Sequence, residues 1–402
     1  MLWQSLTLQL GYNATLVTIG ATLLGLAAGL SGTYLYLRKN SLVSDAISHA
    51  TLPGLGIAFI IMAMFGGSGR FLPGLLIGSA ISAGLGLWCV SLLVRKTRLS
   101  QDAAIGAVLS TFFSFGVVIL TLRQSMPFGN QAGLQSFLLG STAGMLWNDA
   151  LVIAVLALAV TAILILFRRP MRIVAFDETY AQALGYRVGH VDAVILGVTL
   201  TVTVIGMSVV GLILIVALLI IPAVAARFWS EKSDVILKLS GLFGAASGYF
   251  GATLSGFAPN LPAGPIIVLA AFAIFVVSFL LAPERGVLAA SLRFWSFQSR
   301  VHLTQGLLAL AQDRPIYEPR TRRLLIRRGY IRADDVPTEL GRQKAMEIKR
   351  NEARWAYWKQ SVEGGVLSPD TSMVHSLIDI EARLTQDQIA EIDEALANRG
   401  VS

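Results

Sequence analysis

Long apolar runs, each closed by a few charged or turn-forming residues, fill the first 285 positions of the chain. A run of roughly 20 apolar residues crosses a bilayer as a helix, because lipid leaves the backbone only internal hydrogen-bond partners. The pattern predicts an all-α polytopic membrane protein with about eight or nine transmembrane helices. The number depends on whether two short runs that adjoin at Ser208 form a tight hairpin or an irregular pair. The expected helices cover residues 14–37, 42–64, 73–94, 103–122, 149–167, 190–207, 209–226, 236–256 and 264–282. Residues 124–147 are too polar to span and are expected to form an external loop with a short surface or re-entrant helix.

Composition supports this class and divides the chain. Charged residues make up 14% of the whole, against about 25% in a soluble globular domain. Residues 1–285 carry 24 of them and residues 286–402 carry 32. We therefore expect a transmembrane domain over 1–285 and a soluble tail over 286–402.

The distribution of lysine and arginine predicts the orientation, since cytoplasmic loops carry the excess. One set of predicted loops holds 13 cations and the other holds two, Arg70 and Arg123. The tail follows the cation-rich set and is expected in the cytoplasm. The 13 cations are Arg38, Lys39, Arg95, Lys96, Arg98, Arg168, Arg169, Arg172, Arg187, Arg227, Lys232, Lys238 and Arg285.

Pairs of glycines four residues apart recur within the apolar runs. They are Gly25 with Gly29, Gly74 with Gly78, and Gly140 with Gly144. Such spacing allows two membrane helices to approach closely, although membrane helices are rich in glycine in any case.

Asp45 and His49 are ionisable residues inside an apolar run, where they are costly and therefore candidates for function. Their spacing places both on one face of a helix, and a carboxylate with an imidazole suits a first-row divalent metal. Two simpler interpretations remain: Asp45 as a residue at a helix start, and His49 as a hydrogen-bonded packing residue. The pair supplies two ligands, so a complete site needs others from a second helix or a second chain.

The segment 176–186 is amphipathic and lies between two predicted spans. Asp177 and Glu178 are suited to open a short helix and Gly185 to end it. The segment is either a docking helix for a cytoplasmic partner or an ordinary loop helix. No phosphate-binding loop, hydrolase elbow or metalloprotease motif occurs in the chain, so we expect no enzymatic activity within it.

Three segments together resemble the permease subunits of ABC importers for zinc, manganese and iron, the ABC-3 type. They are 37–54, which includes Asp45 and His49; 209–226, with Pro222; and 177–185, which resembles the coupling helix of that family. The resemblance covers about residues 10–285.

The resemblance implies transport of a divalent metal ion, with no permanently bound cofactor. It implies ATP hydrolysis in separate ATPase subunits, a second permease subunit and an extracytoplasmic metal-binding protein, all at the bacterial inner membrane. Asp45 and His49 would then contact the metal, and Asp177, Glu178, Ala181 and Gly185 would couple to the ATPase.

The tail resembles part of the metal-dependent repressors of the diphtheria-toxin-repressor kind. A helix over 320–328, a glycine turn and a helix capped by Thr338 indicate a small winged-helix-like domain. The resemblance offers His375 and Asp379 as a weak regulatory metal site, because Ala382 and Arg383 replace an expected Glu-His pair. The basic residues of the 320–332 region favour an anionic membrane surface over a nucleic-acid partner.

Two other functions stay open from the sequence. One is a membrane-bound metal sensor that uses the tail as its output. The other is a secondary metal carrier that works alone.

Overall fold

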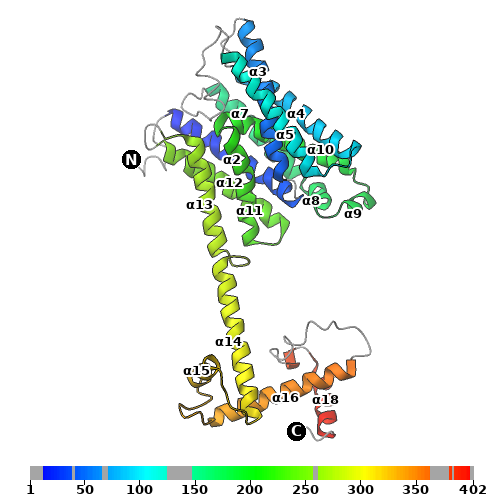
Figure 1. Ribbon diagram of the computed structural model, residues 1–402, viewed down its shortest axis with the longest axis vertical. Coiled ribbons are helices and arrows are strands. Elements are labelled where there is room, and N and C mark those ends of the chain that lie inside the picture. The colour runs from blue at the N-terminus through cyan, green and yellow to red at the C-terminus, as the bar shows by residue number, and fades with distance from the viewer. Residues whose placement is uncertain are drawn as a thin grey trace. The chain divides into compact units, whose positions relative to one another are not determined.

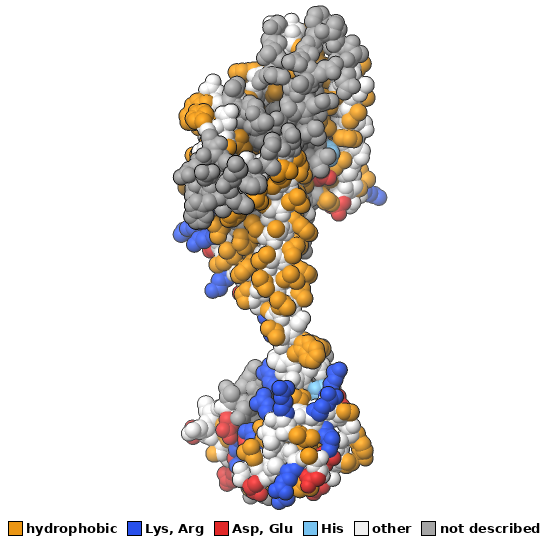
Figure 2. All heavy atoms as spheres, turned by 90° about the vertical axis from the view of Figure 1, so that its left-hand side faces the viewer, with side chains coloured by type: hydrophobic (Ala, Val, Ile, Leu, Met, Phe, Trp, Pro, Cys, Tyr) orange, Lys and Arg blue, Asp and Glu red, His pale blue; other side chains and the backbone are white. Residues whose placement is uncertain are grey.

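The computed structural model describes residues 12–38, 41–65, 71–124, 147–256, 261–362, 380–382 and 384–398. The chain divides into two compact units, Met1–Ala289 and Ala290–Ser402, which we name the body and the tail. On the face shown in Figure 2, hydrophobic side chains cover most of the described body, whereas cationic and acidic side chains are interspersed over the tail.

All nine predicted apolar runs form helices of the body, and two short helices, α8 and α9, follow α7 (Figure 1). The helices are α2 (Tyr12–Leu37), α3 (Ser41–Met64), α4 (Leu72–Lys96), α5 (Gln101–Gln124), α7 (Trp147–Leu166), α8 (Arg168–Phe176), α9 (Glu178–Ala183), α10 (Val188–Val209), α11 (Leu212–Trp229), α12 (Ser233–Ser255) and α13 (Ala263–Leu281).

The all-α polytopic class predicted from the sequence is confirmed. By length and composition seven described helices can cross a membrane, and up to eight if α7 and α8, bent by 64° at their junction, count as one. Helix α11 contributes a shorter apolar segment, Leu214–Trp229. It follows α10 after a two-residue link in which Gly211 takes a φ of 98°, a backbone conformation that favours glycine. The loop predicted over 124–147 lies outside the described residues.

Helices α2 and α12 lie in backbone contact at Gly25 and Gly29, the close approach that such glycine spacing allows. A Cβ on Gly25 would lie 2.1 Å from the carbonyl oxygen of Gly244, and one on Gly29 would lie 2.1 Å from that of Ser240. The Ser240 hydroxyl donates a 2.6 Å hydrogen bond to the Gly29 carbonyl. These contacts leave no room for a side chain and fix the crossing of the two helices.

A second glycine contact joins α3 to α4. A Cβ on Gly54 would lie 2.1 Å from the Gly78 carbonyl oxygen, and one on Gly78 would lie 2.5 Å from the Ala58 Cβ. The Gly74–Gly78 spacing therefore also marks a close approach. Gly140 and Gly144 fall in a part of the chain that the structure does not describe.

The helix ends that carry the predicted cytoplasmic cations lie together, and we name this part of the body the cation-rich end. A cavity of about 220 Å³ is lined by residues from the end of α2, the start of α3, the end of α4, the start of α5 and the start of α10. Ion pairs join Arg172 of α8 to Asp234 of α12, and Arg285 to Glu231. The Arg285 guanidinium holds the pKa of the Glu231 carboxyl below its usual range.

The tail contains α14 (Val287–Ala311, which begins in the body), α15 (Pro319–Arg327), α16 (Glu339–Val362), the short 3₁₀ helix η2 (Ile380–Ala382) and α18 (Gln386–Asn398). As predicted, a glycine turn follows α15, with a φ of 73° at Gly329, and the Thr338 hydroxyl accepts a 3.1 Å hydrogen bond from the Gly341 amide at the start of α16. Between them, the one β feature of the described tail is an isolated bridge from Ile331 to Pro337. The helical part of the prediction is thus present, whereas the winged-helix domain stays a prediction.

Candidate functional site

Asp45 and His49 lie one turn apart on α3, as predicted. The His49 Nε2 atom is 3.4 Å from the Asp45 Oδ1 atom. The Asp45 side chain is 41% exposed and that of His49 is 19% exposed, so the pair opens toward one side of the isolated chain. Both atoms are types that bind first-row divalent metals, and their separation allows one ion to contact both.

The surroundings of His49 hold the imidazole in place. Its ring packs edge-on against Phe113 of α5, with the centroids 5.0 Å apart. Its Nδ1 atom is buried and has no hydrogen-bond partner among the described residues. The other ring nitrogen, Nε2, lies beside the Asp45 carboxylate, so the geometry fits both a packing histidine paired with Asp45 and a histidine whose Nε2 contacts a ligand.

One chain offers an incomplete metal site. Within the described residues, no group of three or more His, Cys, Asp or Glu side chains is placed to hold a metal ion. Structural and catalytic sites for zinc use at least three protein ligands. The pair therefore suits brief contact with a passing ion, or half of a site shared between two chains.

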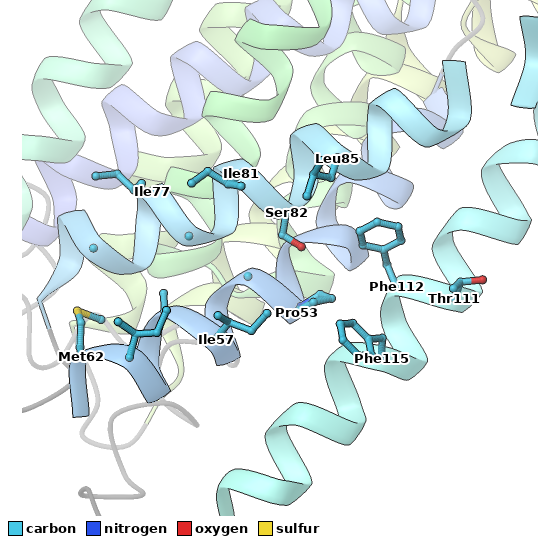
Figure 3. Close-up of a pocket in the computed structure, with 15 residues that line it drawn as sticks. Pro53, Ile57, Met62, Ile77, Ile81, Ser82, Leu85, Thr111, Phe112 and Phe115 are labelled. Atoms are coloured by element: carbon cyan, nitrogen blue, oxygen red, sulfur yellow. The ribbon is translucent and has the colours of Figure 1, made fainter. Parts of the chain in front are cut away.

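An apolar cavity continues the same face of α3 beyond His49. It has a volume of about 610 Å³ and lies among α3, α4 and α5. Figure 3 shows the Phe112 and Phe115 side chains extending from α5 toward α4 and α3. Its lining includes only two hydroxyl side chains, Ser82 and Thr111. Such a wall offers a divalent ion no charged ligand, so the ligating chemistry of this face is confined to Asp45 and His49.

The segment 177–185 forms the short helix that the sequence predicted. The Asp177 carboxylate caps α9 by accepting a 2.9 Å hydrogen bond from the Tyr180 amide. Gly185 ends the segment with a φ of 84°, which a residue with a side chain rarely adopts. Glu178 forms an ion pair with Arg38.

Ala181 is fully buried, so it anchors α9 on the body rather than presenting a surface. Large apolar side chains around it face outward instead: Phe176 is 66% exposed, Tyr180 56% and Leu184 51%. The sequence interpretation did not single out these three residues. The sequence does carry a signal for them: large apolar residues within a charged segment between two membrane helices indicate an exposed contact surface.

The proposed regulatory residues His375 and Asp379 lie outside the described residues. Their neighbour Glu381 accepts a 2.7 Å hydrogen bond from Arg354 of α16. The described part of the tail thus gives this acidic residue a structural ion pair.

Comparison with known proteins identifies the family. Residues 12–282 match the profile of the ABC 3 transport family. The chain belongs to the ABC 3 transport family. Among relatives of this ABC 3 permease, the manganese transport system membrane protein MntC of Bacillus subtilis is 36% identical over 313 residues, which are 78% of this chain and 71% of the relative. The zinc transport system membrane protein TroC of Treponema pallidum is 37% identical over 277 residues, 69% of this chain and 91% of the relative.

A solved structure supports the same fold. The chain is similar to a chain of PsaBC from Streptococcus pneumoniae in complex with Fab, with a TM-score of 0.62 and 29% identity, over 71% of this chain and 98% of that one. The comparisons favour a permease of an ATP-driven importer, and nothing in them favours the sensor or the stand-alone carrier.

The alignment of this ABC 3 permease with one relative reaches beyond the body. The body ends at Ala289, and the alignment with B. subtilis MntC, at 313 residues, is longer than the body. It therefore extends into the tail.

Proposed function

We propose that this chain is the membrane-spanning subunit of an ATP-driven importer whose cargo is a divalent transition metal. Manganese and zinc are the leading candidates because the relatives are named for them. The observation that carries the proposal is the pairing of Asp45 and His49, one carboxylate and one imidazole 3.4 Å apart on a partly exposed face of a membrane helix. Iron uses the same ligand types and remains a third cargo for the test.

Two copies of the chain, or this chain with a similar one, would complete the site. If the pore lies on a two-fold axis, the Asp45 and His49 side chains of both subunits supply four ligands. Four mixed nitrogen and oxygen ligands suit a transition metal and are too few fixed oxygens for calcium, which takes six to eight.

The cation-rich end faces the cytoplasm in this proposal, and the tail lies there too, at the bacterial inner membrane. ATPase subunits dock on the segment 177–185, and an extracytoplasmic binding protein delivers the metal from the other side. Asp177 and Gly185 set the ends of the docking helix, Ala181 anchors it, and Tyr180 and Leu184 offer exposed apolar contact.

Metal uptake in cells tests the cargo site. We expect Asp45→Asn and His49→Ala each to lower uptake of the transported metal by about tenfold or more, since each removes a ligand. Asp102→Asn and His190→Ala are matched controls, because both residues are exposed in first turns of other helices. Wild-type uptake by both site variants at normal expression would reject the pair as cargo ligands.

Co-purification tests the docking segment. Leu184→Glu places a charge on an exposed apolar position and is expected to lower recovery of the ATPase by about tenfold. Leu99→Glu is the control, since Leu99 is similarly exposed between α4 and α5 at the same end of the body. Equal recovery of the ATPase with both variants would contradict docking at 177–185.

A further inference from the structure

Arg38, at the end of α2, joins three other elements of the cation-rich end. Its Nη1 atom donates hydrogen bonds to the Val174 carbonyl of α8, at 3.0 Å, and to the Glu178 carboxylate of α9, at 2.6 Å. Its Nη2 atom donates to both carboxylate oxygens of Asp192 in α10, at 2.6 and 2.8 Å. The Arg38 side chain is only 12% exposed.

This arrangement depends on a guanidinium group. One planar cation meets two carboxylates and a carbonyl near the end of a helix, where the partial charge is negative. Charge-assisted hydrogen bonds that are largely shielded from water are the strong ones, and a lysine lacks the fork needed to make all four. Without the cation, two carboxylates would remain with no compensating charge at this point.

Arg38 also precedes the helix that carries the proposed cargo ligands. Helix α3 begins at Ser41, three residues after Arg38, and Asp45 lies in its second turn. The 220 Å³ cavity at this point is lined by Arg38, by Val43 of α3 and by Asp192 of α10. The start of α3 therefore lies beside the Arg38 cluster, and its Val43 and Ser44 side chains are buried there.

Helix α9 itself has little apolar anchorage. Ala181 is its one buried residue, and Glu178 is fastened through Arg38. A displacement of α9 would therefore act on the Arg38 guanidinium, and Arg38 lies three residues before the start of α3.

We propose that Arg38 is a positioning residue that transmits the position of α9 to α3, and so links the ATPase dock to the Asp45–His49 pair. The inference rests on the proposed function of the segment 177–185. Arg38 does not contact the cargo in this proposal. It determines how much of a movement of α9 is passed on to α3, the helix that carries Asp45 and His49. A purely static clamp would hold the fold together without changing the amount of metal moved for each ATP hydrolysed.

The experiment measures manganese or zinc uptake and ATP hydrolysis in the same proteoliposomes, with the full permease, its ATPase and its binding protein. We expect Arg38→Gln to retain the ATPase and its hydrolysis while uptake per ATP falls about tenfold, as the loss of charge-assisted bonds predicts. Arg38→Lys should retain part of the coupling. Arg172→Gln is the control: Arg172 also ties α8 to another helix, through Asp234, but lies outside the link to α3.

Unchanged uptake per ATP in Arg38→Gln would overturn the proposal. If Arg38→Gln is not recovered folded, Asp192→Asn and Glu178→Gln are tested in its place, because each removes one acceptor and keeps the cation. Normal uptake per ATP in both of these variants would also overturn the proposal. Docking of the ATPase at 177–185, on which the proposal rests, has its own test: it is contradicted if Leu184→Glu still binds the ATPase. Loss of the ATPase in Leu184→Glu with normal coupling in Arg38→Gln rejects the role of Arg38 alone.

Discussion

The body and the tail each contain an arginine that is largely buried and bound to two acidic side chains. In the body, Arg38 binds Glu178 and Asp192. In the tail, Arg354 donates two 2.6 Å hydrogen bonds to Asp393 of α18 and a 2.7 Å bond to Glu381 of η2. Their side chains are 12% and 9% exposed.

The elements that the two arginines join differ. The elements that Arg354 joins also bury apolar side chains of their own: Trp355 of α16, Ile380 of η2, and Ile392 and Leu396 of α18. Around Arg38, α9 buries only Ala181 and depends on the ion pair to be held. The same chemistry thus fixes a folded unit in the tail and tethers a small, weakly packed helix in the body. Four experiments test this difference.

The largest effect is expected for Arg354→Met. The substitution removes three charge-assisted hydrogen bonds to Asp393 and Glu381, which are themselves partly exposed, and should cost roughly 1.5–3 kcal/mol. Hydrogen exchange of the purified chain should show faster exchange across α16 and α18. Arg350→Met is the control, since exposed Arg350 binds the same Asp393 and should contribute at most about 1 kcal/mol. Similar exchange in both variants would show that burial of Arg354 is unimportant.

The tail should also respond to acid. The Arg354 guanidinium, through hydrogen bonds, holds the pKa of Asp393 below its usual range. A carboxylate whose pKa is lowered by folding stabilises the fold above its unfolded pKa, about 3.9, and loses that contribution as the pH falls through the folded value. We expect exchange in α18, corrected for its intrinsic rate, to rise only below about pH 4. An unchanged acid response in Asp393→Asn would contradict this assignment.

In the body, the two acceptors of Arg38 should contribute unequally to coupling. Asp192 is 31% exposed and receives two hydrogen bonds, whereas Glu178 is 56% exposed and receives one. We expect Asp192→Asn to lower uptake per ATP about threefold more than Glu178→Gln, which is the effect of roughly one additional hydrogen bond. A larger effect of Glu178→Gln would show that the direct bond to α9, and not the bonds that hold Arg38 on α10, limits coupling.

The smallest effect is expected for Arg172→Gln. Arg172 and Asp234 are 36% and 54% exposed, and ion pairs at such positions contribute at most about 1 kcal/mol. Thermal unfolding of the purified chain should therefore change little. A loss of stability as large as that of Arg354→Met would show that exposure does not separate the two kinds of ion pair.

The helices and the Asp45–His49 pair were predictable because their signals are local. An apolar run of membrane length and two polar residues four positions apart are visible within one segment, and so are the capping residues of α9. The glycine spacings likewise indicated a close approach, although not which helices meet.

The Arg38 cluster was not predictable in this way. Glu178 and Asp192 lie 140 and 154 positions from Arg38, so no periodicity links them. In the sequence Arg38 was one of 13 cations that indicate orientation, and Asp192 was not singled out. The sequence signal that could have found the cluster is Asp192 itself. An acidic residue near the start of an apolar helix needs a cationic or hydrogen-bonding partner. The bend between α7 and α8 and the outward-facing Tyr180 and Leu184 also needed the structure.

The backbone contact between α2 and α12 has a consequence for how the protein is made. The Ser240–Gly29 hydrogen bond joins residues 211 positions apart. At a synthesis rate of about 5–20 residues per second, α2 waits roughly 10 to 40 seconds for its partner to leave the ribosome. During that interval its glycine face has no α12 to cover it, so α2 must be stable in lipid before the body can close around it.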